Sequence, residues 1–212
     1  SFSNHGVRRV ISRWGGDDPP EGLRRLVPVL LGSLRGTVCL YQGEELGLTE
    51  ADVPFEALQD PYGKAFWPTF KGRDGCRTPM PWNDDGPHAG FSHGEPWLPV
   101  PGEHRARNVE AQDADSASVL NAARKFLQWR KAQPALVLGS IRFLDAPPSI
   151  LAFVREHEGE RVLVAFNLSA SSVDWRAPEG MAFLQAPGVG AAELRDGNLR
   201  FPPRGGAYAA LR

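Results

Sequence analysis

Hydrophobic residues recur at helical spacing between residues 20 and 34. The repeated positions are Leu23, Leu26, Val27, Leu30, Leu31 and Leu34. They fall on one face of an α-helix, so we predict an amphipathic helix over residues 20–34. Pro28 lies inside this segment and is expected to weaken or kink the helix, and Gly36 ends it.

A short apolar run over residues 37–41 follows and is rich in residues that favour strands. A fully apolar strand next to a helix is typical of a buried parallel sheet. We therefore predict a buried strand here, in which Cys39 acts as a small hydrophobic residue.

Residues 49–117 show little hydrophobic periodicity and are rich in Pro, Gly, Asp and Trp. A loop this long inside a compact domain is uncommon and tends to be functional. Its aromatic residues would either anchor the loop or form a binding wall, and anchoring is the more common role. They include Phe66, Trp67, Trp82 and Trp97.

Helical periodicity returns over residues 118–133 and then gives way to alternation. Ser116 or Ser118 would cap the helix, and Pro134 would stop it. Beyond it we predict a hairpin of residues 150–155 and 161–167, with its tight turn at Glu158-Gly159-Glu160. Further strands are predicted at residues 173–175, 182–184, 199–201 and 207–211. The region from about residue 137 is therefore predicted to be an all-β sandwich.

The composition narrows the classes of function. The chain has 24 basic and 25 acidic residues and a net charge of -1, which argues against a partner such as nucleic acid or an anionic membrane. No apolar run is long enough to span a bilayer, and two cysteines cannot staple a disulfide scaffold. The chain starts at Ser1 without a visible signal peptide, which suggests a fragment or a processed piece. We expect a cytoplasmic location.

Three polar motifs stand apart from the predicted elements. They are Phe-Ser-Asn-His-Gly at residues 2–6, Tyr-Gln-Gly-Glu-Glu-Leu-Gly at residues 41–47, and Gly-Arg-Asp-Gly-Cys-Arg-Thr-Pro-Met-Pro-Trp at residues 72–82. In this order they resemble the α-amylase superfamily of glycoside hydrolases, and within it the exo-acting α-glucosidases and oligo-1,6-glucosidases. The resemblance covers nearly the whole chain. It implies a (β/α)8 barrel with its active site at the carboxyl ends of the strands, followed by a β-sandwich.

On this resemblance the fold class is an α/β barrel fragment followed by an antiparallel β-sandwich domain. Residues 1–135 would be the C-terminal part of the barrel, with helix seven at residues 20–34, strand eight at residues 37–41 and helix eight at residues 119–130. Residues 136–212 would be the sandwich. An unclosed barrel exposes a strand edge. We therefore expect the barrel part to need the missing barrel half or a homodimer, whereas the sandwich folds alone.

The resemblance also implies roles for particular residues. Asn4 and His5 would contact the sugar at the cleaved subsite, and Arg73 would hold the terminal glucose. The family places a transition-state carboxylate directly after Asn-His, and here that position is Gly6. The nucleophile and the acid/base would follow strands four and five, which these residues do not include. The alternatives are a structural histidine at His5 and a loop ion pair between Arg73 and Asp74 or another acid.

Two other polar groups could be mistaken for catalytic or metal sites. Glu44 and Glu45 are adjacent, so in an extended segment their side chains would point to opposite faces, and we expect them to anchor the loop. The group of His88, His93, Asp84 and Asp85 matches no common ligand spacing. We therefore predict no metal and no cofactor.

The predicted function is that of a partial α-glucosidase-type glycoside hydrolase. The parent reaction would be the retaining hydrolysis of terminal α-linked glucose, with an α-glucoside oligosaccharide as substrate. Such enzymes need two opposed carboxyl groups, so these residues alone are expected to be inactive. The alternative is a non-catalytic carbohydrate-binding or interaction module.

Overall fold

A computed structural model describes residues 2–212, and their contacts form two compact units. The first unit combines the residues up to Arg24 with Cys39–Asn121. The second combines Arg25–Val38 with Ala122–Arg212. The predicted boundary between residues 135 and 136 stays a prediction.

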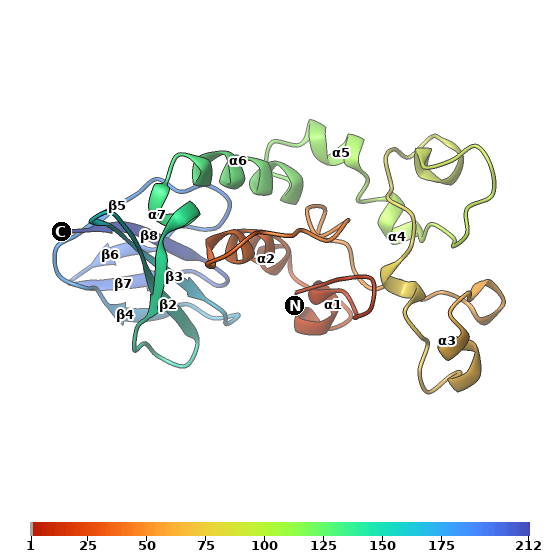
Figure 1. Cartoon of the computed structure of the whole chain (residues 1–212), viewed down its shortest axis with the longest axis horizontal. Helices are drawn as coiled ribbons and strands as arrows, with labels where there is room; N and C mark the ends of the chain where they lie inside the picture. The colour runs from red at the N-terminus through yellow and green to blue at the C-terminus, as the bar shows by residue number, and fades with distance from the viewer. Residues whose placement is uncertain (1) are drawn as a thin grey trace. The chain divides into compact units, whose positions relative to one another are not determined.

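The second unit contains two antiparallel sheets (Figure 1). The five-stranded sheet has the order β1 (Ser140–Phe143), β2 (Ile150–His157), β3 (Glu160–Asn167), β8 (Gly206–Leu211) and β5 (Met181–Phe183). The three-stranded sheet has the order β4 (Val173–Arg176), β7 (Asn198–Phe201) and β6 (Glu193–Arg195). The predicted antiparallel β module is confirmed. Strands β1 and β6 were not predicted from the sequence, because they are short and mostly exposed.

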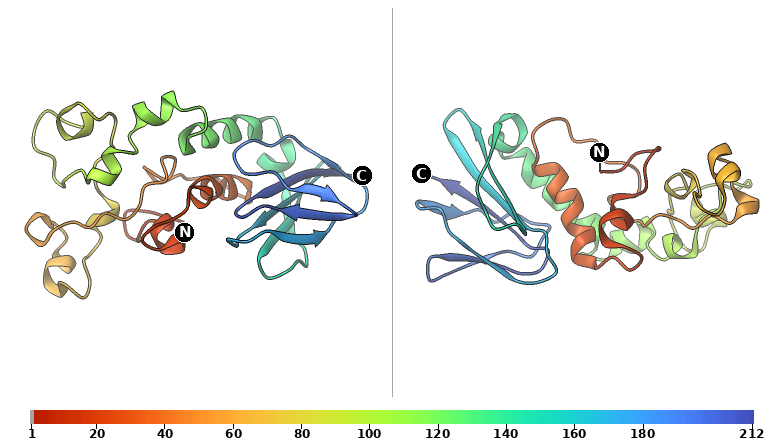
Figure 2. Two further views of the ribbon diagram at one scale, coloured as in Figure 1. Left: turned by 180° about the vertical axis from the view of Figure 1, so that it is seen from behind. Right: turned by 90° about the horizontal axis from the view of Figure 1, so that it is seen from below.

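Alternation along the strands builds the core between the two sheets (Figure 2). Leu163 and Ala165 of β3 are buried in the same cluster as Leu199 and Phe201 of β7. The hairpin of β2 and β3 closes with His157 opposite Glu160. Its two turn residues, at 158 and 159, have φ angles of 49° and 85°. Positive φ at both positions is typical of a type I′ turn, so the predicted hairpin is confirmed.

The opposite face of the five-stranded sheet is covered by helical residues of the same unit. Tyr208 of β8 lies on this face, with its ring centroid 5.8 Å from Phe126 and 5.1 Å from Trp129. Both of those residues belong to α6 (Val119–Lys131). The Tyr208 hydroxyl also lies 2.5 Å from Ser33 Oγ. The central strands β2, β3 and β8 of this sheet are therefore mostly buried on both faces.

Both long helices were predicted correctly. The first is α2 (Glu21–Ser33), which accommodates Pro28 in its interior. The second is α6, where Ser118 Oγ accepts a hydrogen bond from the Asn121 amide at 3.1 Å and so caps the helix start. Pro134 does more than stop α6, because it begins the short helix α7 (Pro134–Leu138).

The predicted strand over residues 37–41 is wrong. The structure has no regular element there, and Cys39 is exposed rather than buried. A strand is stable only when a neighbouring strand pairs with its backbone groups. Among the described residues none does so, and the Tyr41 amide donates instead to Glu44 Oε2 at 3.0 Å.

The first unit consists of short helices joined by long loops. Besides the starts of α2 and α6, its α-helices are α1 (Val10–Gly15), α3 (Pro61–Phe66), α4 (Gly102–Arg105) and α5 (Val109–Ala114). Single 3-10 turns lie at Phe55–Ala57, Asp74–Cys76 and Pro87–Gly90. The segment 49–117, predicted as one long loop, therefore contains several short helices between its loop stretches.

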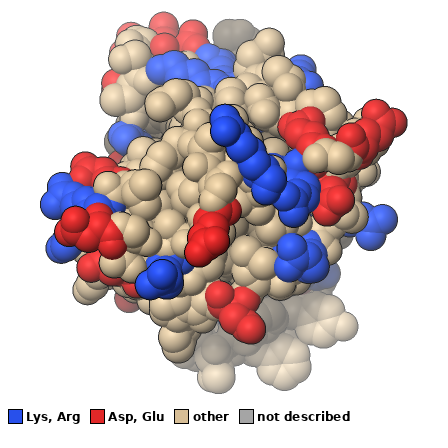
Figure 3. Space-filling model, turned by 90° about the vertical axis from the view of Figure 1, so that its left-hand side faces the viewer, with Lys and Arg blue, Asp and Glu red and all other residues tan. Residues whose placement is uncertain are grey.

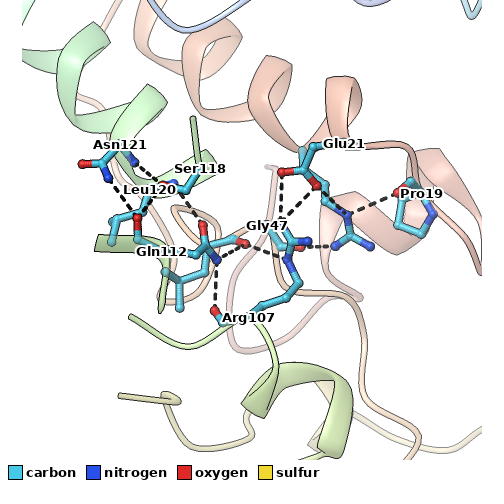
Figure 4. Close-up of polar contacts among 10 residues, drawn as sticks. Pro19, Glu21, Gly47, Arg107, Gln112, Ser118, Leu120 and Asn121 are labelled. Carbon is cyan, nitrogen blue, oxygen red and sulfur yellow. Dashed lines mark hydrogen bonds and ion pairs between the residues drawn. The ribbon is translucent and has the colours of Figure 1, made fainter. Parts of the chain in front are cut away.

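Side chains that donate to backbone carbonyls hold this unit together (Figure 4). The Leu46 carbonyl accepts from Arg107 Nε at 3.2 Å and from Gln112 Nε2 at 3.0 Å. The neighbouring Gly47 carbonyl accepts from Arg24. Arg107 also forms an ion pair with Glu21 at 3.2 Å. These contacts satisfy buried loop carbonyls that have no strand or helix partner.

The surface in Figure 3 carries charges of both signs, with basic side chains near its centre flanked by acidic ones. Within residues 2–212, no helix has both the length and the apolar character that a bilayer-spanning segment requires.

Candidate functional site

A pocket of about 570 Å³ in the first unit brings two of the three motifs together. Gly6 of the first motif and Arg73 of the third both line it. Asn4 and His5 are not among its lining residues. The rest of the wall is Arg8, Asp17, Glu50, Ala51, Asp52, Val53, Thr69, Phe70, Lys71, Gly72 and Gly75.

The first motif is a tight turn organised by its asparagine. Asn4 Oδ1 accepts a hydrogen bond from the Gly6 amide at 2.7 Å. His5 is exposed at the turn, and its carbonyl accepts from Arg77 Nε at 2.8 Å. A Cβ atom at Gly6 would meet only Asn4 Oδ1, at 3.3 Å. The backbone therefore accepts a larger residue at this position after a small shift of the Asn4 side chain.

Arg73 forms a bidentate ion pair in the pocket wall. Its Nε and one terminal nitrogen each lie 2.8 Å from an oxygen of Asp60. The guanidinium lies 5.6 Å from the centre of the Tyr62 ring. These hydrogen bonds from Arg73 hold the pKa of Asp60 far below its ordinary value. The Arg73 side chain is 37% exposed, so part of it remains accessible from the pocket.

The partner of Arg73 is Asp60 and not Asp74, which the sequence analysis named first. Asp74 is fully buried, and its Oδ2 accepts from the Gln59 amide at 2.6 Å and the Asp60 amide at 2.8 Å. Asp60 also caps α3 by accepting from the Tyr62 amide. Asp60 was not among the predicted site residues, although an aspartate directly before Pro61 is a helix-start signal.

Arg9 connects the second and third motifs and was also missed. Its guanidinium is buried, and it donates to the Gln42 carbonyl at 2.7 Å and the Cys76 carbonyl at 3.1 Å. Its own amide donates to Glu50 Oε2 at 2.8 Å. Burial lowers the pKa of the Arg9 guanidinium. No periodicity in the sequence signals this role, because arginine is rarely fully buried.

The acidic pair of the second motif lies outside the pocket wall. Glu44 is buried and accepts the Tyr41 amide, and burial raises the pKa of both Glu44 and Glu45. The hydrogen bond between Tyr41 and Glu44 indicates that Glu44 anchors this loop. His88 lies 3.6 Å from Glu95. Across residues 2–212, no three or more His, Cys, Asp or Glu side chains are grouped so that they could hold a metal ion.

Two family models match the chain along nearly all of its length. Residues 1–139 match the α-amylase catalytic domain, and residues 141–210 match the C-terminal domain of maltogenic amylase. A probable α-glucosidase of Rhizobium meliloti is 46% identical over 213 residues, which covers all of this chain and 38% of that protein. An oligo-1,6-glucosidase of Bacillus cereus is 32% identical over 86% of this chain and 36% of its own length. The chain thus spans less than two fifths of these relatives.

Solved structures agree with the sequence matches. The α-glucosyl transfer enzyme XgtA superposes with a TM-score of 0.95 at 54% identity, over 99% of this chain and 39% of that one. The trehalulose synthase MutB of Pseudomonas mesoacidophila superposes with a TM-score of 0.81 at 28% identity, over 99% of this chain and 42% of that one. From these matches the chain belongs to the α-amylase family of glycoside hydrolases.

Proposed function

We propose that this chain is the C-terminal portion of an α-glucosidase-type glycoside hydrolase. The parent reaction is the retaining hydrolysis of terminal α-linked glucose from short oligosaccharides. The observation that carries the proposal is that Gly6 and Arg73 line one pocket, although they belong to different motifs. The names of the relatives, which include a probable α-glucosidase and an oligo-1,6-glucosidase, support the same reaction.

In this proposal the chain supplies the last part of a (β/α)8 barrel, with α2 as helix seven and α6 as helix eight. Asn4, His5 and Arg73 bind the sugar. The exposed His5 offers one donor and one acceptor to hydroxyl groups. Arg73 already uses one edge of its planar guanidinium on Asp60, which fixes its orientation. The rest of a barrel or a second copy of the chain would complete the site, in the cytoplasm.

We also propose that residues 1–212 do not hydrolyse glucosides by themselves. Retaining glycosidases use two carboxyl groups about 5–5.5 Å apart, and the family adds a third carboxylate where this chain has Gly6. The direct test is the purified chain with an aryl α-glucoside. Turnover that co-purifies with the chain through several columns would contradict the proposal.

A substitution at Gly6 tests the proposed role of that position. We expect Gly6→Asp to raise the hydrolysis rate about 100-fold or more in a chimera that joins residues 1–212 to the N-terminal part of the Rhizobium meliloti relative. The reason is that a carboxylate at a developing positive charge stabilises the transition state, and removal of one such electrostatic contact typically costs 10²–10³ in rate. Initial rates on an aryl α-glucoside provide the measurement.

The matched control for this chimera is Gly6→Asn, which has the same size without the charge. It should stay as slow as the Gly6 form. Equal rates for the Gly6 and Gly6→Asp forms of the chimera would show that a carboxylate introduced at position 6 takes no part in catalysis.

The alternative function, a non-catalytic carbohydrate-binding module, is favoured by one feature. Phe70 lines the pocket and is 49% exposed, so its ring could stack on a sugar. Saturable binding of maltose by the chain, together with an inactive Gly6→Asp chimera, would support this function over the first.

A further inference from the structure

Glu50 is the most buried acid of the pocket wall. Asp17 and Asp52, the other two acids that line the pocket, are exposed, whereas Glu50 is half-buried. Burial raises the pKa of the Glu50 carboxyl. A carboxyl group that loses part of its hydration needs hydrogen-bond donors to remain ionised.

The protein fixes Glu50 at both its backbone and its side chain. The Glu50 amide donates to Ser12 Oγ at 2.7 Å, and Glu50 Oε2 accepts from the Arg9 amide at 2.8 Å. Ser12 and Arg9 are themselves buried at the start of α1. Two hydrogen bonds to buried residues therefore fix the position of Glu50, and fixed positions of this kind preorganise a binding group.

The third motif leaves room for this carboxyl at Gly75. A Cβ atom at Gly75 would come within 2.6 Å of Glu50 Oε1 and 2.5 Å of the Ala51 carbonyl. The Gly75 carbonyl also accepts from the Ala51 amide at 3.0 Å. The absence of a side chain at this position therefore lets Glu50 Oε1 lie against the motif that carries Arg73.

Other charged side chains of the wall are occupied by ion pairs. Lys71 lies 2.5 Å from Asp52, and Arg8 lies 3.8 Å from Asp17. Arg73 is paired with Asp60. Glu50 takes a backbone amide on Oε2 instead, and within residues 2–212 no hydrogen bond to its Oε1 is found. A carboxylate only accepts hydrogen bonds, and O–H groups are the donors that a sugar presents.

We infer that Glu50 is a substrate-binding residue that accepts hydrogen bonds from hydroxyl groups of an α-glucoside in this pocket. The inference rests on the proposed function, because it assumes that the pocket holds a sugar. It adds to that function a carboxylate contact on the wall segment that follows the second motif. Glu50 orients the ligand and takes no part in bond cleavage.

The test is the affinity of the full 212-residue chain for maltose, measured by isothermal titration calorimetry. Glu50→Gln keeps an oxygen for the Arg9 amide but replaces the second acceptor with a donor. We expect it to raise the dissociation constant about 10- to 100-fold, the range for a hydrogen bond to a charged group. Glu56→Gln is the matched control, because it makes the same change at an exposed glutamate outside the pocket wall. We expect that control to change the constant less than about twofold.

Each outcome decides between the two proposals. If the unaltered chain shows no saturable maltose binding, the role of Glu50 is overturned, whereas the proposed function is tested separately by the aryl α-glucoside rates of the Gly6→Asp chimera. If Glu50→Gln binds as the unaltered chain does while Arg73→Met does not, only the inference about Glu50 is overturned. Equal losses in Glu50→Gln and Glu56→Gln would also overturn it, since they would indicate a general effect of charge.

A second variant distinguishes a loss of binding from a failure of Glu50→Gln to fold. Glu50→Asp keeps the charge but withdraws the carboxylate by one methylene, and we expect it to weaken maltose binding several-fold. Its thermal midpoint is compared with that of the unaltered chain by circular dichroism. Full affinity in a folded Glu50→Asp protein would contradict the inference.

Discussion

Single buried polar residues hold the loops of the first unit in place, and His104 of α4 is one of them. Its side chain is 1% exposed. Nε2 lies 2.9 Å from the Thr49 carbonyl, and Nδ1 lies 3.2 Å from Thr78 Oγ1. Because a carbonyl only accepts, Nε2 carries the proton and Nδ1 accepts from the threonine hydroxyl. The neutral ring thus forms hydrogen bonds with two loop segments at once, at Thr49 and at Thr78.

This arrangement predicts a loss of stability in mild acid. Burial, with a smaller effect of the Arg9 charge, lowers the pKa of His104 from 6.5 to about 4. The unfolded chain therefore binds a proton that the folded chain excludes between these two values. The stabilisation is complete above pH 6.5 and decreases as the pH falls towards 4, by about 3 kcal/mol in all. Urea unfolding at a series of pH values measures this slope.

Two glutamine variants isolate the contribution of His104. His104→Gln should flatten the dependence between pH 6.5 and 4, because the titrating group is gone. His93→Gln replaces an exposed histidine and should leave the dependence as it is. The explanation fails if both variants keep the slope of the unaltered chain.

Among the elements, strand β2 is tied to the end of helix α2 by a buried arginine. Arg155 is fully buried and donates to the carbonyls of Ser33 and Leu34 at 2.8 Å and 3.0 Å. It also donates to the carbonyls of Gly139 and Ser140. The last carbonyls of a helix have no partner within the helix and carry partial negative charge. Arg155 therefore caps the C-terminal end of α2.

Removal of this guanidinium should destabilise the protein strongly. We expect Arg155→Leu to lower the free energy of unfolding by about 3 kcal/mol or more, because it leaves several buried carbonyls without donors. Arg155→Lys should recover little, since a single ammonium cannot span the two pairs of carbonyls. Chemical denaturation followed by circular dichroism measures both changes.

The neighbouring strand offers a matched control in Arg142, which is exposed on β1. Arg142→Leu should change the free energy of unfolding by less than about 0.5 kcal/mol. If Arg155→Leu were as mild, water would have to reach the carbonyls of the helix end, and the cap described above would be incorrect.

Local patterns predicted the elements that satisfy their own hydrogen bonds. The spacing of Leu23, Leu26 and Leu30 gave α2, and alternation with a turn at Gly159 gave the β2–β3 hairpin. Residues 37–41 have the composition of a strand but no strand partner among the described residues, and composition alone does not reveal this. The pocket likewise depends on long-range contacts, such as Arg73 with Asp60 and Arg9 with Cys76. The motifs predicted which segments matter, but not which side chains hold them.

For the whole molecule, helical residues that precede the β module in the chain cover one face of its five-stranded sheet. Phe166 and Tyr208 lie on the outer face of the five-stranded sheet with ring centroids 5.9 Å apart. Phe126 and Trp129 of α6 cover Tyr208. The prediction that residues 136–212 fold alone considered only the core between the two sheets. It did not include this second core, because helix spacing and strand spacing do not show which faces meet.

This second core leads to a prediction about fragments. We expect residues 118–212 to melt cooperatively and at a higher temperature than residues 136–212, and to bind less of a hydrophobic dye. The shorter fragment loses Phe126 and Trp129, and burial of one large side chain stabilises by about 1.5–3 kcal/mol. A longer fragment that carries Phe126→Ser and Trp129→Ser is the control, and it should resemble the shorter one. If residues 136–212 gave the same melting temperature as the longer fragment without dye binding, the core between the two sheets would be sufficient and α6 would not be part of the folding unit.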